Sequence, residues 1–111
     1  MMNEVDLYQW KIWKYSIPLK ESEGLRARQF SIQLPKHAKI LSVAAQHNEP
    51  VMWVAIQEDL SYPPLEPHDF ILCETGRVMP KDPTSILTTF IGTILLDDGA
   101  YVLHIFEITG S

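Results

Sequence analysis

The chain has 111 residues but only one cysteine, Cys73, so it cannot form an internal disulfide and must be stabilised by packing. It contains no uninterrupted apolar stretch of roughly 18 residues that could form a transmembrane helix. The N-terminal segment MMNEVDLYQWKIWK lacks the basic region, apolar run and small-residue cleavage site of a signal peptide. These absences predict a protein of a reducing cytoplasm that makes no membrane contact.

Positive charge is also scarce, because 9 lysine and arginine residues stand against 14 acidic residues and give a formal net charge of -5. This balance disfavours binding to duplex nucleic acid, which depends mainly on clustered cations. A hydrophobic fraction of 46% with 21% charged residues argues against disorder. The composition therefore predicts one folded, acidic domain.

The strong catalytic and metal-binding motifs are missing as well. We find no glycine-rich phosphate loop, nucleophile elbow, H-E-x-x-H or C-x-x-C. His37, His47 and His68, each expected in a turn, have no partner at the spacing of a zinc site. We therefore predict that the chain is not an enzyme and uses no metal or cofactor.

Helical periodicity is absent too: no segment keeps a period near 3.6 for more than two turns, and proline or glycine interrupts nearly every long window. Short runs rich in β-branched and aromatic residues occur instead, separated by turn residues. The sequence predicts an all-β single domain over residues 1–111, a small sandwich or barrel of about seven mostly antiparallel strands. Residues 1–9 are expected to form a flexible N-terminal arm.

The central feature of the pattern is a hairpin of residues 40–45 and 51–56, joined by a polar turn that contains Asn48. Asp97, Asp98 and Gly99 form the strongest hairpin signal, because they separate two apolar runs. The other expected strands are residues 10–17, an edge strand, and residues 29–34, 70–75, 87–96 and 100–107.

Three connections are expected to be irregular. Residues 19–25 form a polar surface loop, and residues 57–68 form a long loop restricted by three prolines. The third connection covers residues 78–85, with one helical turn predicted at residues 83–86 after Pro83.

The turn Thr75-Gly76-Arg77 is the best candidate for a ligand site. A strand that ends in Thr-Gly presents a hydroxyl group and backbone amides, and the planar guanidinium of Arg77 suits phosphate or carboxylate. Trp53 is an aromatic residue that could stack on a base. The alternative interpretation is an ordinary β-turn that needs glycine and carries a solvated arginine.

His104 lies among apolar residues on one face of the last expected strand. We interpret it as a core or subunit-contact histidine satisfied by a hydrogen bond, so its replacement should reduce stability; the alternative is a catalytic or metal role. Cys73 is interpreted as a small apolar filler rather than a nucleophile. Glu74 and Glu107 are interpreted as solvated acids.

Several blocks of the chain occur in a recognisable order. They are KIWKYSIPL (11–19), LPKHAKILSV (34–43), Gln46, Trp53, Thr75-Gly76, FIGT (90–93) and VLHIFE (102–107). This series resembles a family of uncharacterised small proteins of bacteriophages and prophages, with the pattern I-x-K-Y, P-x-x-A-x-I-L-S-V, W, T-G, Y-I-G-T and V-F-H-V-F-E. The chain departs from it at Phe90 and Leu103. The resemblance implies an accessory phage protein that modulates its host.

The leading hypothesis is a non-enzymatic binding protein of the host cytoplasm that self-associates and inhibits host defence by sequestering a small nucleotide signal. Thr75, Gly76 and Arg77 would contact phosphate, and Trp53 would stack on the base. The alternative is a protein-protein module that blocks a host enzyme or serves phage assembly through its acidic surface. A third hypothesis is a small hydrolase that uses His47 or His104.

Overall fold

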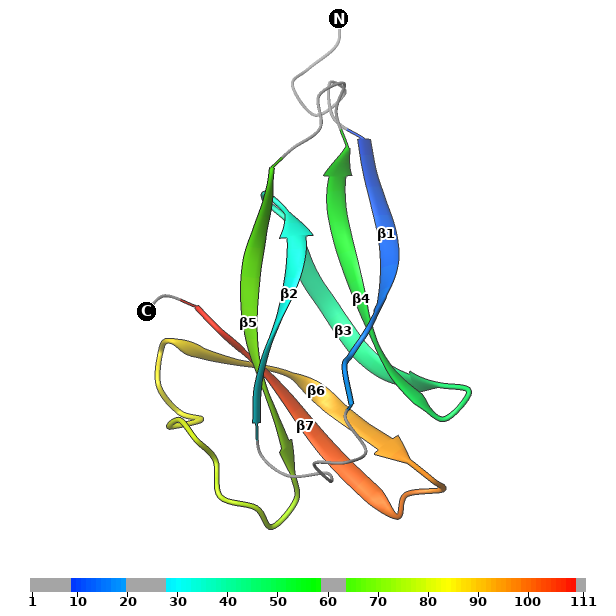
Figure 1. Cartoon of the computed structure of the whole chain (residues 1–111), viewed down its shortest axis with the longest axis vertical. Helices are drawn as coiled ribbons and strands as arrows, with labels where there is room; N and C mark the ends of the chain where they lie inside the picture. The colour runs from blue at the N-terminus through cyan, green and yellow to red at the C-terminus, as the bar shows by residue number, and fades with distance from the viewer. Residues whose placement is uncertain (1–8, 20–27, 59–63, 110–111) are drawn as a thin grey trace, which may run out of the picture.

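The computed structural model describes residues 9–19, 28–58 and 64–109, and within them the backbone consists of strands and turns (Figure 1). All strand pairs in these ranges are antiparallel. The strands are β1 (Gln9–Ser16), β2 (Arg28–Pro35), β3 (Lys39–Gln46), β4 (Glu49–Glu58), β5 (Leu65–Glu74), β6 (Thr88–Leu96) and β7 (Tyr101–Ile108). The predicted all-β single domain of seven strands is confirmed.

The strands form two sheets, one with the order β1-β4-β3 and the other with the order β2-β5-β7-β6. The sheets face each other without closing, so of the two predicted architectures the chain adopts the sandwich and not the barrel (Figure 1). Within the described residues, no helix is long and apolar enough to cross a membrane.

Left-handed residues make the turn between β3 and β4. His47 and Asn48 have φ values of 52° and 60°, which is the two-residue hairpin geometry that asparagine tolerates well. Gln46 and Glu49 already pair across the two strands, so the turn is shorter than the predicted polar linker. The predicted hairpin itself is confirmed.

The turn between β6 and β7 is also built as predicted. Asp97, Asp98 and Gly99 all have positive φ values, and the Gly99 amide donates to the carbonyl oxygen of Leu96. The side-chain oxygen of Asn48 accepts a hydrogen bond from the Asp97 amide at 2.6 Å. The ends of the two hairpins, which belong to different sheets, are therefore linked.

The core lies between the sheets. Leu34, Met52, Val54 and Phe70 are among its fully buried side chains, and the rings of Phe30 and Phe70 stack with centroids 5.3 Å apart. β2 follows the predicted alternation, because Leu34 is buried and its neighbour Gln33 is exposed. Pairing of β2 with β5 thus places alternate apolar residues of both strands in the core.

The two sheets approach each other most closely where β3 packs against β6. Gly92 lies at an irregularity of β6, and a Cβ atom built there would stand 2.9 Å from a methyl group of Val43. Only a residue without a side chain fits this contact without a shift of its neighbours.

The prediction of a loop over residues 57–68 is wrong at both ends. β4 continues to Glu58, and β5 begins at Leu65. Pro67 lies within β5 opposite Gln33, at a point where the pairing of β5 with β7 has not yet begun. Because β2 is the only described neighbour there, the missing amide hydrogen of proline is tolerated. Residues 59–63 lie outside the described ranges.

The predicted helical turn at residues 83–86 is also wrong. Thr84 donates to the Asp82 carboxylate from its hydroxyl group at 2.7 Å and from its amide at 2.8 Å. These bonds lower the pKa of the Asp82 carboxyl and favour a local side-chain turn over a helix. The segment instead makes isolated turns, with bonds from the Ser85 amide to Asp82 and from the Thr88 amide to Ser85.

β1 is the predicted edge strand, because β4 is its only neighbour among the described strands. Its Tyr15 packs against the core, so the odd-numbered residues of β1 face inward and the even-numbered residues face outward. The N-terminal arm was predicted over residues 1–9, but Gln9 is the first residue of β1, and residues 1–8 lie outside the described ranges. Of the predicted loop at residues 19–25, only Leu19 is described.

Candidate functional site

One row of side chains on the outer face of the four-stranded sheet joins chemically active residues from three strands. Cys73 of β5 lies opposite His104 of β7, and His104 lies opposite Thr93 of β6. Leu103 and Ile105, the neighbours of His104 in the chain, are fully buried in the core. Because side chains alternate along a strand, His104 points away from the core.

Both ring nitrogens of His104 have a hydrogen-bond partner. The Oγ1 atom of Thr75 lies 2.8 Å from Nε2, and the Oγ1 atom of Thr93 lies 3.0 Å from Nδ1. A neutral imidazole donates from one nitrogen and accepts at the other, so one threonine donates to the ring and the other accepts from it. The expectation that hydrogen bonds satisfy His104 is confirmed, but the residue is half-buried on the outer face and is not part of the core.

Thr75 reaches His104 because the chain turns at the end of β5. Gly76 has a φ of 89°, which a glycine adopts without strain. The Thr75 amide donates to Val102 at 3.0 Å, and the Arg77 amide donates to Glu74 at 3.0 Å. Among the described residues the Gly76 amide has no hydrogen-bond partner. The predicted turn therefore exists and leaves one of its three amides available.

Arg77 is the positive group of this turn. Its side chain is 62% exposed, and its Nε atom lies 3.7 Å from the Glu74 carboxylate. An ion pair of this length on the surface contributes little to stability. An incoming anion could therefore compete with Glu74 for the guanidinium at low cost.

Cys73 is buried beside the same turn. Its thiol donates weakly to the carbonyl oxygens of Glu74 and Arg77. Burial and the neighbouring charge of Glu74 raise the pKa of the thiol above its ordinary value. A raised pKa disfavours the reactive thiolate, which agrees with the interpretation of Cys73 as a packing residue.

Apolar side chains flank the polar row on both sides. Phe90 and Phe106 lie opposite each other with ring centroids 5.3 Å apart and planes tilted by 57°. Leu95 lies opposite Val102 on the other side of the row. Phe90 is 55% exposed and Leu95 is 57% exposed. A ligand bound at His104 would therefore also meet apolar surface.

The structure brings three of the four predicted site residues together. Thr75, Gly76 and Arg77 form one turn, and Thr75 joins it to His104. Trp53 is half-buried in β4 of the other sheet, between Lys14 of β1 and Ser42 of β3. Its predicted contact with the same ligand remains a prediction.

Sequence reasoning missed Thr93 and Phe90 as members of this site. A signal for Thr93 was present, because a hairpin closed by Asp97, Asp98 and Gly99 brings residue 93 opposite residue 104 if the turn has four residues. Phe90 could not be placed in this way, because the irregularity between Phe90 and Gly92 shifts the register of β6 against β7.

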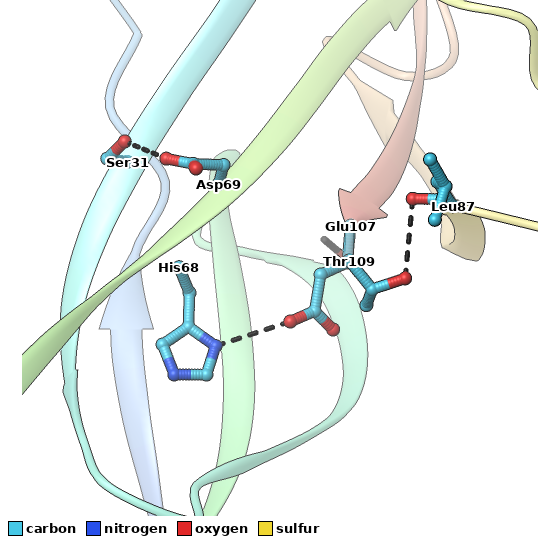
Figure 2. Close-up of polar contacts among 6 residues, drawn as sticks. All are labelled: Ser31, His68, Asp69, Leu87, Glu107 and Thr109. Carbon is cyan, nitrogen blue, oxygen red and sulfur yellow. Dashed lines mark hydrogen bonds and ion pairs between the residues drawn. The ribbon is translucent and has the colours of Figure 1, made fainter. Parts of the chain in front are cut away.

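The remaining histidines are distributed over the fold. His37 and His47 occupy turns, as predicted, but His68 lies in β5, where its Nδ1 atom is 3.2 Å from a carboxylate oxygen of Glu107. Glu107 is therefore paired, as Glu74 is with Arg77, and the interpretation of these two residues as solvated acids is wrong. Figure 2 shows this contact beside the bonds from Ser31 to Asp69 and from Thr109 to Leu87.

Within the described residues no group of three or more His, Cys, Asp and Glu side chains could hold a metal ion. Of the two arginines near the start of β2, Arg28 is its first residue, and Arg26 lies outside the described ranges.

Replacement of His104 by glutamine is expected to lower the free energy of unfolding by about 1–2 kcal/mol, because two hydrogen bonds of ordinary strength are lost. Thr93→Val is the matched partner, since it removes one hydroxyl and keeps the side-chain shape. In urea denaturation, the double variant should cost at least about 0.5 kcal/mol less than the sum of the single variants. Strict additivity would show that the contact between these residues stabilises nothing.

Residues 9–111 match the model of a family described as "Domain of unknown function (DUF7352)". No curated protein and no solved structure matches the chain.

Proposed function

We propose a non-enzymatic binding function for this chain, which belongs to the DUF7352 family, a family of unknown function. The ligand would be a small nucleotide whose phosphate binds at the turn Thr75-Gly76-Arg77. The observation that carries the proposal is the hydrogen-bonded series Thr75, His104 and Thr93, which lies beside the available Gly76 amide and the exposed Arg77.

This arrangement offers hydrogen-bond donors to an anion. When His104 is neutral, the threonine that accepts its N–H keeps its own hydroxyl hydrogen for a ligand. When His104 is protonated, both ring nitrogens donate, so both threonine hydroxyls can donate outward. Together with the Gly76 amide and the planar Arg77 fork, these groups suit a phosphate.

The apolar rows beside His104 provide a surface for the base. Phe90 is exposed on the same face as His104, and bases stack on aromatic side chains with little dependence on sequence. We therefore propose Phe90 as the stacking residue within one chain. Trp53 would stack on the base only if a second copy of the chain brought its own Trp53 to the ligand.

The resemblance to bacteriophage and prophage proteins supports a narrower version of the proposal. In this version the protein acts in the host cytoplasm and inhibits host defence by sequestering a nucleotide signal. The raised pKa of the Cys73 thiol supports a role in binding over nucleophilic chemistry.

Calorimetric titration with a panel of cyclic and adenosine-derived nucleotides tests the proposal. At least one nucleotide should release heat at micromolar protein, and Arg77→Ala should then weaken binding at least about tenfold, as expected for a lost charged hydrogen bond. Phe90→Ala should weaken it by about 1–3 kcal/mol. A panel without heat would rule out nucleotide binding.

Two further variants serve as controls in the same titration. Lys81→Ala removes a positive charge from the exposed segment after the turn and should leave the affinity within about twofold. Trp53→Ala distinguishes the two candidate stacking residues. If it weakens binding and Phe90→Ala does not, the base lies on the three-stranded sheet and the proposed placement is wrong.

A second candidate function is a protein-protein module with an acidic surface. The linked ends of the two hairpins carry Asp97 and Asp98 beside a groove that Ala45, Asn48 and Leu95 also line. Such a surface could imitate a phosphate backbone and block a host enzyme or serve phage assembly. A protein partner that co-purifies from host lysate and is released by salt, together with a nucleotide panel without heat, would favour this function.

A further inference from the structure

The free edge of β1 is unusual because it carries large apolar side chains. Trp10, Ile12 and Trp13 are 47%, 65% and 50% exposed. β1 pairs with β4 on one side only among the described strands, and it contains neither proline nor glycine (Figure 1). An apolar edge strand readily accepts another strand, but Lys11 and Lys14 discourage pairing unless the second copy places suitable groups opposite them.

We propose that β1 pairs with β1 of a second copy of this chain, antiparallel and about a two-fold axis through Ile12. The sequence of β1 from residue 10 to residue 14 is Trp-Lys-Ile-Trp-Lys. In this register Trp10 lies opposite Lys14 of the second copy, and Lys11 lies opposite Trp13 of the second copy. Ile12 meets its own symmetry mate. Each lysine therefore faces a tryptophan, which is a favourable cation-π arrangement.

Other registers are less favourable. An axis between Ile12 and Trp13 places Lys11 opposite Lys14, and an axis through either lysine places that lysine opposite itself. Like charges directly opposite each other destabilise a strand pair. An axis through Trp13 avoids this conflict but pairs Lys11 with Tyr15 and Lys14 with Ile12, so only one of the two lysines faces an aromatic ring.

The proposed register also keeps the faces of the sheets in line. It pairs even-numbered residues with even-numbered residues, so the outward face of one copy continues into the outward face of the other. The three strands of each copy would then form one continuous sheet, and both free β1 edges would be covered. Lys14 donates to Gln46 of β3 at 2.5 Å across the outer face, so its ammonium group has to leave this exposed bond to reach the tryptophan of the second copy.

Sedimentation of the full chain across a concentration series tests the pairing. Wild type should reach twice the chain mass of 12.7 kDa. Trp13→Lys should remove the dimer, because it puts a second lysine opposite Lys11. Lys11→Glu combined with Trp13→Lys should restore the dimer through a glutamate-lysine pair, in this register alone. Val78→Lys, which adds the same charge at an exposed loop position, should have no effect.

Oxidative cross-linking identifies the register. Cysteines introduced by Ile12→Cys would lie directly opposite each other, at the Cα separation that a disulfide needs. Those introduced by Trp13→Cys would be diagonal neighbours about 7–8 Å apart, which is too far. Disulfide-linked dimers should therefore form for Ile12→Cys and not for Trp13→Cys. The opposite result, or a wild-type monomer at every concentration, would overturn the proposal.

This inference does not depend on the proposed function, because β1 belongs to the other sheet. If Trp13→Lys is monomeric and still binds a nucleotide, the dimer and the ligand site are separate properties. If wild type forms the dimer but neither wild type nor Trp13→Lys releases heat with any nucleotide, only the proposed function fails.

Discussion

Replacement of Phe70 by alanine is expected to lower the free energy of unfolding by about 3–5 kcal/mol. Phe70 has no exposed surface and lies in β5, which has a neighbour on each side. Its ring stacks on that of Phe30 at 5.3 Å. Truncation removes the largest fully buried side chain from the core and leaves a cavity between the sheets. Urea denaturation followed by tryptophan fluorescence measures the loss.

Phe90→Ala is the matched control, because it makes the same chemical change at a side chain that is 55% exposed. Its cost should be about 1 kcal/mol, the value of its contact with Phe106. Equal losses of unfolding free energy for the two variants would show that Phe70 is not part of the core. The control has a second use, since it establishes that Phe90→Ala is folded when its nucleotide binding is measured.

Replacement of Gly92 by alanine is expected to cost about 1–3 kcal/mol, because overpacking forces a shift where the sheets meet. The new Cβ atom would stand 2.9 Å from a methyl group of Val43. Since Thr93 follows directly, the same shift should disturb its hydrogen bond to His104. Urea denaturation gives the cost, and nucleotide titration gives the effect on the site.

Val43→Ala provides the rescue for this variant. It removes the methyl group that the new side chain meets, so the double variant should cost less than the sum of the two single variants. Gly99→Ala is a control that introduces backbone strain without a steric clash, whereas Gly92→Ala introduces a clash. No atom lies within 4 Å of a Cβ built at Gly99, but its φ of 87° penalises alanine. Additive costs for Gly92→Ala and Val43→Ala would show that the close contact is not the cause.

The candidate site could be predicted only in part. Thr75, Gly76 and Arg77 were recognisable because three consecutive residues build the turn, and Gly76 indeed adopts a positive φ. His104 was interpreted as a core or subunit-contact residue because Val102 and Phe106, which share its strand face, are apolar. In the structure those apolar residues form an outer face of the sheet, and burial of a face depends on what packs against it and not on the strand itself.

Two errors of prediction have similar causes. Prolines in residues 57–68 indicated a loop, yet pairing with β2 makes His68 part of a strand, and the pairing of β5 with β7 brings it to Glu107. Pro83 indicated a helical turn, yet the Asp82 side chain binds Thr84 and forms a turn instead. In both places the backbone preference of proline was a poor guide, because a contact with another residue determined the local structure.

The amino-acid order alone determined the elements that a few neighbouring residues can specify. Alternation in residues 29–34 and the turn Asp97-Asp98-Gly99 act over short distances, so β2 and the β6-β7 hairpin were predictable. Only the tertiary structure decided which strands share a sheet and which residues meet. Thr75 and His104 are 29 positions apart, and their contact exists because β5 pairs with β7 in one register among many. That register is set by the packing of the whole core, which depends on contacts among all the strands and cannot be deduced from one segment alone.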